Sequence, residues 1–236
     1  MQRNSNLYTF IFALIVCMLC SLVVSSVFEG LRAKRELNEF IDARKNILQA
    51  AGVVGPISPA TNPNDLLKTY RAKIEEVVID KNGNIQEGMT PDNIEPTDEK
   101  YPLYIYREEG RIQAYCFPIE GKGLWSTIFG FLALESDAKT IRGITFHKHG
   151  ETPGLGAEIE KKWFLDNFKG KRIWDEEKNI LKPIRVVKGK VVDLIPEAES
   201  KFYVDGITGA TMTSDGVTRL LDHWIRIYDR YLRKVR

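Results

Sequence analysis

A long apolar stretch near the N-terminus constrains this chain more than any other feature of its sequence. Residues 7–27 are almost all apolar, and no charged side chain lies between Arg3 and Glu29. A helix over this stretch is roughly 30 Å long, which matches the hydrocarbon thickness of a bilayer. The sequence therefore predicts a short tail at residues 1–6 and a transmembrane helix at residues 7–27.

A cleaved signal peptide is the alternative interpretation of this stretch. The apolar region is longer than the usual core of a signal peptide, and the segment before it has only one arginine. No small-residue cleavage motif follows, and neither Cys17 nor Cys20 is preceded by the small residue that a lipoprotein signal needs. We therefore expect an uncleaved, single-pass anchor that contacts membrane lipid.

The remaining chain divides into three parts by pattern and composition. Residues 28–52 continue the helical spacing of apolar side chains and predict a connecting helix that stops at Gly52. Residues 53–100 are rich in proline and predict a loop-rich appendage, with a short helix at 63–73. Residues 101–236 carry the patterns of a compact domain.

Alternating apolar runs and helical spacings predict the elements of this compact domain. Residues 103–107 and 112–117 alternate around Glu109-Gly110, which is typical of a hairpin. Strand pairs joined by hairpins, with helices late in the chain, indicate an α+β domain with a mainly antiparallel sheet and flanking helices. The other expected elements are a hairpin about Asn82-Gly83, strands at 129–135 and 141–147, a helix at 158–168, a hairpin of 184–187 with 191–194, and a final helix capped by Ser214.

Composition and motif content argue against several classes of function. A net charge of +2 is not that of a nucleic-acid binder. Cys116 is the only cysteine outside the apolar stretch, so this chain alone cannot build an intradomain disulfide, a cysteine metal site or an iron–sulfur cluster. No glycine-rich dinucleotide motif follows a strand, which argues against a Rossmann NAD site. The histidines, which are His147, His149 and His223, lack metal-ligand spacing.

The stretch DGITGATMTS, Asp205 to Ser214, combines glycines with hydroxyl side chains directly before an amphipathic helical pattern. Small residues at the start of a helix leave backbone N–H groups free to bind an anion, and the helix dipole favours negative charge there. The plainer alternative, which the local pattern alone favours, is a glycine turn capped by a hydroxyl residue. The apolar face of the helix is formed by Val217, Leu220, Leu221, Trp224, Tyr228 and Tyr231.

The segment DGITGAT resembles the Asp-x-x-(Ser/Thr)-Gly-Ala-Thr motif of FMN-binding domains in ion-pumping respiratory complexes. In that family FMN is attached through a phosphodiester to the last threonine, which corresponds to Thr211. The resemblance implies that this chain carries a covalent FMN and that the neighbouring motif residues bind it. These residues are Asp205, Thr208, Gly209 and Ala210, with Thr213 directly beyond the motif.

Two other segments match the same family, and each has a plain structural alternative. The run GKGLW, Gly121 to Trp125, is without the family a hairpin end with a core tryptophan. The run HGETPGLG, His149 to Gly156, is a strand-to-helix turn whose proline and glycines permit a tight backbone. The resemblance implies instead that both runs border the flavin, through Trp125, Glu151, Thr152, Leu155 and Gly156.

With the N-terminal anchor, these motifs occur in the order found in the C subunits of Na+-translocating NADH:quinone oxidoreductases. The G subunits of Rnf-type ferredoxin:NAD oxidoreductases share the motifs and are the related alternative. The resemblance implies a subunit of a Na+-pumping NADH:ubiquinone reductase that works with subunits of the A, B, D, E and F types. It would pass single electrons from a membrane-embedded 2Fe–2S centre, through its FMN, to the flavin of another subunit. A non-redox, membrane-anchored scaffold or binding domain is the alternative from another class.

The sequence offers no activating group for Thr211. No histidine lies near this residue in the sequence, and an unassisted threonine hydroxyl is a weak nucleophile. We therefore interpret Thr211 as the substrate of a separate flavin transferase rather than as a catalytic residue.

The charges around the apolar stretch and the family resemblance predict opposite orientations. A cluster of basic residues soon after the stretch favours a cytoplasmic domain by the positive-inside rule. That rule weakens for large translocated domains, and the resembled family carries its flavin domain outside. We therefore expect a protein of the bacterial inner membrane with its flavin domain on the periplasmic side. The basic residues are Arg32, Lys34, Arg35, Arg44 and Lys45.

Overall fold

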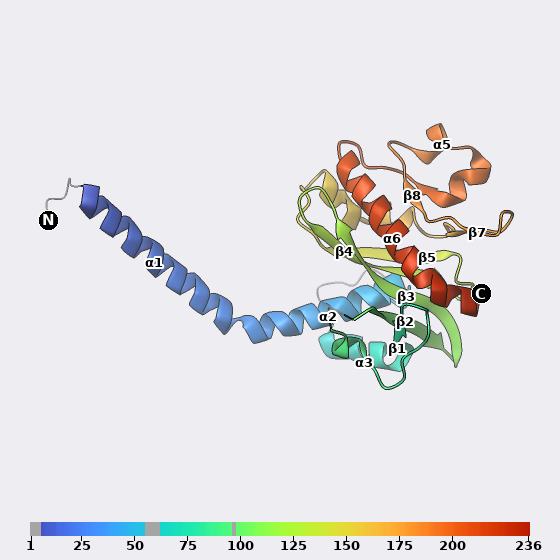
Figure 1. Cartoon of the computed structure of the whole chain (residues 1–236), viewed down its shortest axis with the longest axis horizontal. Helices are drawn as coiled ribbons and strands as arrows, with labels where there is room; N and C mark the ends of the chain where they lie inside the picture. Colours follow the sequence, from blue (N-terminus) through green and yellow to red (C-terminus); the bar gives the residue numbers. More distant parts are fainter. Residues whose placement is uncertain (1–5, 55–61, 96–97) are drawn as a thin grey trace. The chain divides into compact units, whose positions relative to one another are not determined.

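The structure is a computed structural model that describes residues 6–54, 62–95 and 98–236 (Figure 1). The predicted tail at residues 1–6 lies almost wholly outside the described residues, and the predicted appendage at 53–100 lies partly outside them. The chain divides into two units, Met1–Ala43 and Arg44–Arg236.

The first unit consists of a long apolar helix and the beginning of a second helix. Helix α1 spans Asn6–Gly30, has no buried residue, and is long and apolar enough to cross a membrane. Helix α2 begins at Arg32 after a break at Leu31 and runs to Ala50. Apolar side chains exposed along a whole helix need an apolar surrounding, which a bilayer supplies.

The second unit is built on a five-stranded sheet whose strands follow one another in chain order. Every neighbouring pair is antiparallel, which confirms the predicted α+β class with a mainly antiparallel sheet. The Glu109-Gly110 turn between the second and third strands has positive φ at both residues, as a type I′ hairpin turn requires. The strands are β1 Ile74–Asp80, β2 Lys100–Glu108, β3 Arg111–Lys122, β4 Thr127–Glu135 and β5 Ile141–Lys148.

The sheet begins earlier in the chain than the predicted domain boundary at residue 101. Strand β1 pairs with β2 from Ile74 opposite Tyr106 to Asp80 opposite Lys100. Helix α3, Pro63–Lys73, leads into β1 and buries Leu66. Part of the predicted appendage is therefore the edge of the sheet and its entry helix. The bridge between Ile79 and Ile85 forms the expected short hairpin about Asn82-Gly83.

The long C-terminal helix α6, Thr211–Val235, packs on the sheet against β3 (Figure 1). The ring of Tyr228 stacks on Phe117 at a centroid distance of 4.1 Å, and its hydroxyl donates to the Pro102 carbonyl at 2.7 Å. Gly121 allows this close packing, because a Cβ there would lie 2.6 Å from Leu220 Cβ. The sheet and α6 thus enclose one apolar core.

Two predicted elements are wrong in the structure. The helix expected at 158–168 is instead a 3-10 turn, η2 Gly156–Glu160, followed by α4 Lys162–Asp166, because Lys161 is extended. The hairpin expected between 184–187 and 191–194 is absent from the described residues, since each half finds another partner. The observed elements in this region are α5 Val191–Leu194 and β8 Arg185–Val186, which pairs in parallel with β9 Tyr203–Val204.

Shorter elements complete the described part of the chain and connect the larger ones. They are the 3-10 turns η1 Pro91–Asn93 and η3 Glu197–Phe202, and the two-residue strands β6 Trp174–Asp175 and β7 Ile180–Leu181, which pair antiparallel.

Candidate functional site

The DGITGAT segment forms a tight turn that ends at the first residue of α6. Gly209 has φ +77°, a conformation that favours glycine, and α6 begins at Thr211. The predicted cap at Ser214 is wrong, because Ser214 is buried inside the first turn and its N–H donates to the Ala210 carbonyl at 3.0 Å. Thr208, Gly209 and Thr211 are all exposed, so the turn and the helix start face outward.

Asp205 and Gly206, at the start of the same segment, hold a neighbouring turn in place. The Asp205 carboxylate accepts the Val191 N–H at 2.7 Å, and the Gly206 N–H donates to the Gly189 carbonyl at 2.8 Å. A side chain at Gly206 would lie 2.0 Å from the Val187 carbonyl oxygen. These contacts start α5 and explain why 184–187 and 191–194 do not form a hairpin. They also give the motif aspartate an intramolecular role.

Glu151 joins the three segments that the sequence singles out. Its Oε1 accepts backbone N–H groups of the hairpin end, from Trp125 at 3.0 Å, Leu124 at 3.1 Å and Ser126 at 3.4 Å. Its Oε2 accepts the hydroxyl of Thr213 in the first turn of α6 at 2.5 Å. One carboxylate, only 5% exposed, thus ties the GKGLW and HGETPGLG segments to the start of α6.

The glycines of these segments surround that carboxylate. A Cβ at Gly123 would lie 2.5 Å from Glu151 Oε1, and one at Gly156 would lie 2.8 Å from Oε2 and 2.6 Å from Thr213 Oγ1. These distances are shorter than side chains tolerate, so any larger residue would displace the carboxylate. At these two positions glycine therefore allows the close approach of Glu151.

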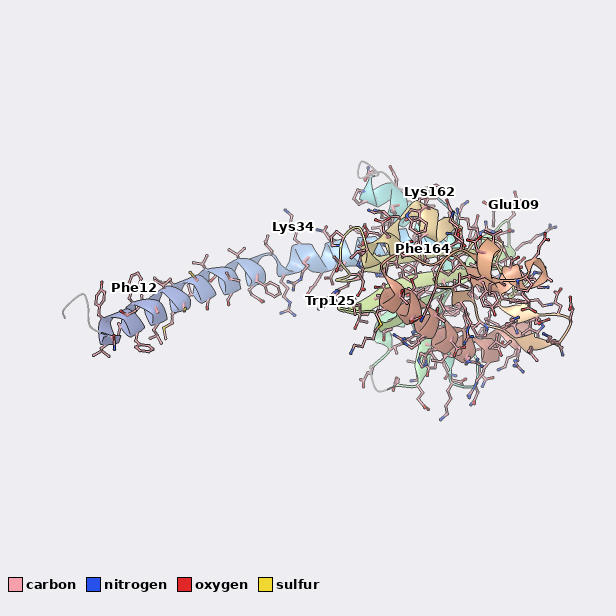
Figure 2. All side chains as sticks on the ribbon, turned by 90° about the horizontal axis from the view of Figure 1, so that it is seen from above. Phe12, Lys34, Glu109, Trp125, Lys162 and Phe164 are labelled. Carbon is pink, nitrogen blue, oxygen red and sulfur yellow. The ribbon has the colours of Figure 1, made fainter. Side chains whose placement is uncertain are left out.

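Each of the three segments also carries at least one large apolar side chain that is exposed. Trp125 is 71% exposed and lies at the periphery of the domain (Figure 2). Leu155 touches the DGITGAT turn, since a Cβ on Gly209 would lie 3.0 Å from Leu155 Cδ2. We call Leu124, Trp125, Leu155 and Met212 the apolar platform; all four side chains are exposed.

The structure separates the predicted site residues into outward-facing and buried groups. Trp125, Thr152, Leu155, Thr208, Gly209 and Thr211 are exposed, Asp205 is half-buried, and Glu151, Gly156, Ala210 and Thr213 are buried. Sequence reasoning did not identify Leu124 and Met212. The sequence indicates these two residues only weakly: each is a large apolar residue beside glycine or hydroxyl residues, in a loop or at a helix start.

Glu151 also makes a testable contribution to stability as a function of pH. Burial raises the pKa of its carboxyl, but the hydrogen bonds from Thr213 and the three N–H groups outweigh burial, so the pKa is lowered. The carboxylate therefore stabilises the fold above its unfolded pKa of about 4.3, and this contribution is lost as the pH falls through the lower folded pKa.

We expect Glu151→Gln to lower the free energy of unfolding at pH 7 by about 1–3 kcal/mol, the scale of a hydrogen bond to a charged group. Denaturant unfolding of both proteins between pH 7 and pH 3 measures the difference, which should shrink below about pH 4. A difference that stays constant across this range would contradict the assigned ionised state.

Comparisons with known proteins agree on one family. The FMN-binding domain family matches residues 123–226, a span that contains Trp125, the Glu151 loop and the start of α6. Over 97% of its length the chain is 32% identical to the C subunit of the Na(+)-translocating NADH-quinone reductase of Yersinia pestis, of which it covers 92%. The chain belongs to the family of these C subunits.

A second sequence relative and a crystal structure from the C-subunit family also match this chain. The C subunit of the reductase of Vibrio alginolyticus is 31% identical over 93% of this chain and 91% of its own length. The crystal structure of the C subunit from Parabacteroides distasonis is 32% identical, with a TM-score of 0.72 over 86% of this chain and 96% of that chain. Membership of the C-subunit family confirms the predicted family and the class of enzyme, a subunit of an oxidoreductase complex with further subunits. It favours this family over the Rnf-type alternative.

Proposed function

We propose that this chain carries single electrons within a Na+-translocating NADH:ubiquinone reductase, through an FMN joined to Thr211 Oγ1 by a phosphodiester. The bound flavin would supply one-electron chemistry between a membrane-embedded 2Fe–2S centre and the flavin of a B-type subunit. The observation that carries the proposal is the exposed Thr211 at the start of a 25-residue helix, after a turn that Leu155 of the apolar platform touches.

The surroundings of Thr211 fit the phosphate end of FMN. The first turn of a helix has N–H groups without intrahelical partners, and its dipole favours an anion. The neighbouring hydroxyls are less accessible, since Thr213 is 1% exposed and bound to Glu151, and Ser214 is 2% exposed. Thr208 is the one other hydroxyl of the DGITGATMTS segment that the structure leaves exposed. Burial therefore excludes Thr213 and Ser214, and of the two exposed threonines only Thr211 lies in the first turn of α6.

The apolar platform fits the ring end of FMN. Trp125 offers a flat aromatic surface, and the exposed side chains of Leu124, Leu155 and Met212 offer aliphatic contacts. Covering such side chains removes apolar area from water, at roughly 25 cal/mol per Å². These residues would orient the ring and exclude water from one of its faces, while the phosphodiester keeps it from dissociating.

A separate flavin transferase would attach the cofactor. The transfer forms an O–P bond between Thr211 Oγ1 and the FMN phosphate, breaks the pyrophosphate bond of FAD, and releases AMP and the hydroxyl proton. The carboxylate of Glu151 is occupied by Thr213 and by backbone N–H groups, so it is not available as a base for Thr211. General-base assistance would have to come from the transferase.

Denaturing electrophoresis of the protein from a host that has the transferase tests this function. We expect a yellow-fluorescent band and an intact mass increased by one FMN residue. A colourless band of unmodified mass would contradict the proposal and favour the non-redox scaffold. In the purified complex, rapid mixing with NADH should then reduce this flavin during turnover.

We further propose that α1 anchors the chain in the bacterial inner membrane beside subunits of the A, B, D, E and F types. The apolar helix supports the anchor, and translocation of large domains largely regardless of flanking charge supports a periplasmic domain. Reporter fusions after Arg236 test the side of the membrane. Alkaline phosphatase should be active there, and a fluorescent protein that folds only in the cytoplasm should be dark. The reverse pattern would put the domain in the cytoplasm, as the basic residues after the apolar stretch predict.

A further inference from the structure

We propose that Glu151 is a positioning residue, whose buried carboxylate fixes the Trp125 hairpin end relative to the flavin attachment point at Thr211. This inference rests on the proposed function and adds to it a device that sets the geometry of the site. It differs from the family expectation that Glu151 lines the flavin.

The carboxylate of Glu151 faces inward. The residue is 5% exposed, and both of its oxygens accept hydrogen bonds from within the domain. Gly123 and Gly156 close around it, with room for no Cβ on either side. A group enclosed in this way acts on a bound ring through the residues that it holds, and not by touching the ring.

The first of these held segments is the end of the β3–β4 hairpin. The N–H groups of Leu124, Trp125 and Ser126 all point at Glu151, so the backbone of this hairpin end is drawn inward. Ser126 adds a second tie, because its hydroxyl accepts the Gly150 N–H at 2.5 Å. The backbone of Trp125 is thereby fixed while its ring stays 71% exposed. An exposed ring on a fixed backbone is suited to stacking on a planar ligand.

The second held segment is the first turn of α6. Thr213 donates its hydroxyl to the same carboxylate, and Thr211 lies two residues earlier on the same turn. Gly216 keeps this helix close to the hairpin, since a Cβ there would lie 2.7 Å from the Lys122 carbonyl oxygen. The Glu151 carboxylate thus holds both the hairpin end that carries Trp125 and the helix turn that carries Thr211.

The test compares variants of the full-length, flavin-loaded protein by flavin fluorescence per mole of covalent flavin. An indole ring stacked on a flavin quenches its emission, so Trp125→Leu gives the unquenched reference. Glu151→Gln keeps the side-chain size but removes the negative charge from every hydrogen bond that the carboxylate accepts. We expect the ratio of stacked to unstacked ring to fall by about tenfold, the scale of one hydrogen bond to a charged group, and emission to rise toward the reference. Glu158→Gln, which loses only a bond to the Trp163 indole, is the matched control and should leave emission unchanged.

The double variant Glu151→Gln/Trp125→Leu distinguishes positioning of Trp125 by Glu151 from a general contribution of Glu151 to the fold. If Glu151 acts through Trp125, Glu151→Gln should change emission little in the Trp125→Leu background. An equal fold-change in both backgrounds, or a lower melting temperature with unchanged emission, would overturn the inference.

Thr213→Val covers the case in which Glu151→Gln does not fold. It removes the hydroxyl that donates to Glu151 Oε2 and should raise emission in the same direction, whereas Thr213→Ser keeps the hydroxyl and should not. Unchanged emission in Thr213→Val would likewise overturn the inference. The covalent flavin mass of the unaltered protein is measured first, and its absence would overturn the proposed function itself.

Discussion

Replacing Thr211 with alanine is expected to abolish covalent flavin while leaving the fold intact. Thr211 is exposed at the first position of α6, and alanine is favourable in a helix, so stability should change by no more than about 0.5 kcal/mol. Intact mass and in-gel fluorescence measure the loss of the flavin, and thermal unfolding measures the fold. The effect should be complete, because a phosphodiester needs this one oxygen.

Two neighbouring substitutions serve as controls for Thr211→Ala. Thr208→Ala removes the other exposed hydroxyl of the segment and should leave the flavin in place. Thr213→Val removes a buried hydroxyl and should likewise retain covalent flavin, although it loses the bond to Glu151. Full flavin in Thr211→Ala, together with loss in Thr208→Ala, would move the attachment to Thr208.

Gly156→Val should have the largest effect on stability among the changes considered for this site. The new side chain would crowd Thr213 Oγ1 and Glu151 Oε2, so it combines overpacking with the loss of a buried hydrogen bond. Together these effects should lower the free energy of unfolding by about 3 kcal/mol or more. Denaturant unfolding measures the loss. In molecules that stay folded, Thr211 should still be modified, with an altered flavin spectrum or slower reoxidation.

Gly154→Ala, two residues earlier in the same loop, is the matched control. Gly154 has φ +73°, but a Cβ there meets nothing within 4 Å, so alanine should cost only about 1 kcal/mol of backbone strain. If Gly154→Ala is as harmful as Gly156→Val, the loop is sensitive to any side chain. The specific crowding of Glu151 would then be the wrong explanation.

The sequence predicted correctly those elements whose formation depends on the spacing of nearby residues. The apolar stretch, the Glu109-Gly110 hairpin and the amphipathic face of α6 follow from periods of 3.6 or 2 residues and from turn chemistry. The hairpin expected at 184–194 was wrong because its partners lie elsewhere. The Val191 N–H binds Asp205, and Val186 pairs with Val204, contacts that no local pattern reveals.

The candidate site was likewise predicted only in part from the sequence. Sequence motifs indicated which segments form it, but not which side chains face outward. Thr211 and Thr213 are alike in residue type, but Thr213 lies on the buried face of α6, four residues before Val217, and donates to Glu151, 62 residues away. The cap of α6 was misplaced at Ser214, although the helix was expected after Thr211; Ser214 lies within the first turn, three residues before Val217 on the buried face.

The enclosure of Glu151 by Gly123 and Gly156 predicts how these positions vary among related proteins. The nearest neighbour of a Cβ at Gly123 is the carboxylate itself, whereas at Gly156 it is Thr213 Oγ1, so position 123 should vary with the acid among distant relatives more closely than position 156 does. A lineage that replaces the acid with a smaller residue removes the contact of Oε1 with position 123, where only the end of the Ile128 side chain would still have to move for alanine to fit. Position 156 would still face Thr213 Oγ1 at 2.6 Å and the Cβ of residue 151 at 2.9 Å, so glycine should persist there. Such a lineage can have lost the hairpin tie while still keeping a threonine at 211, so the attachment motif and the acid–glycine set are separable in evolution.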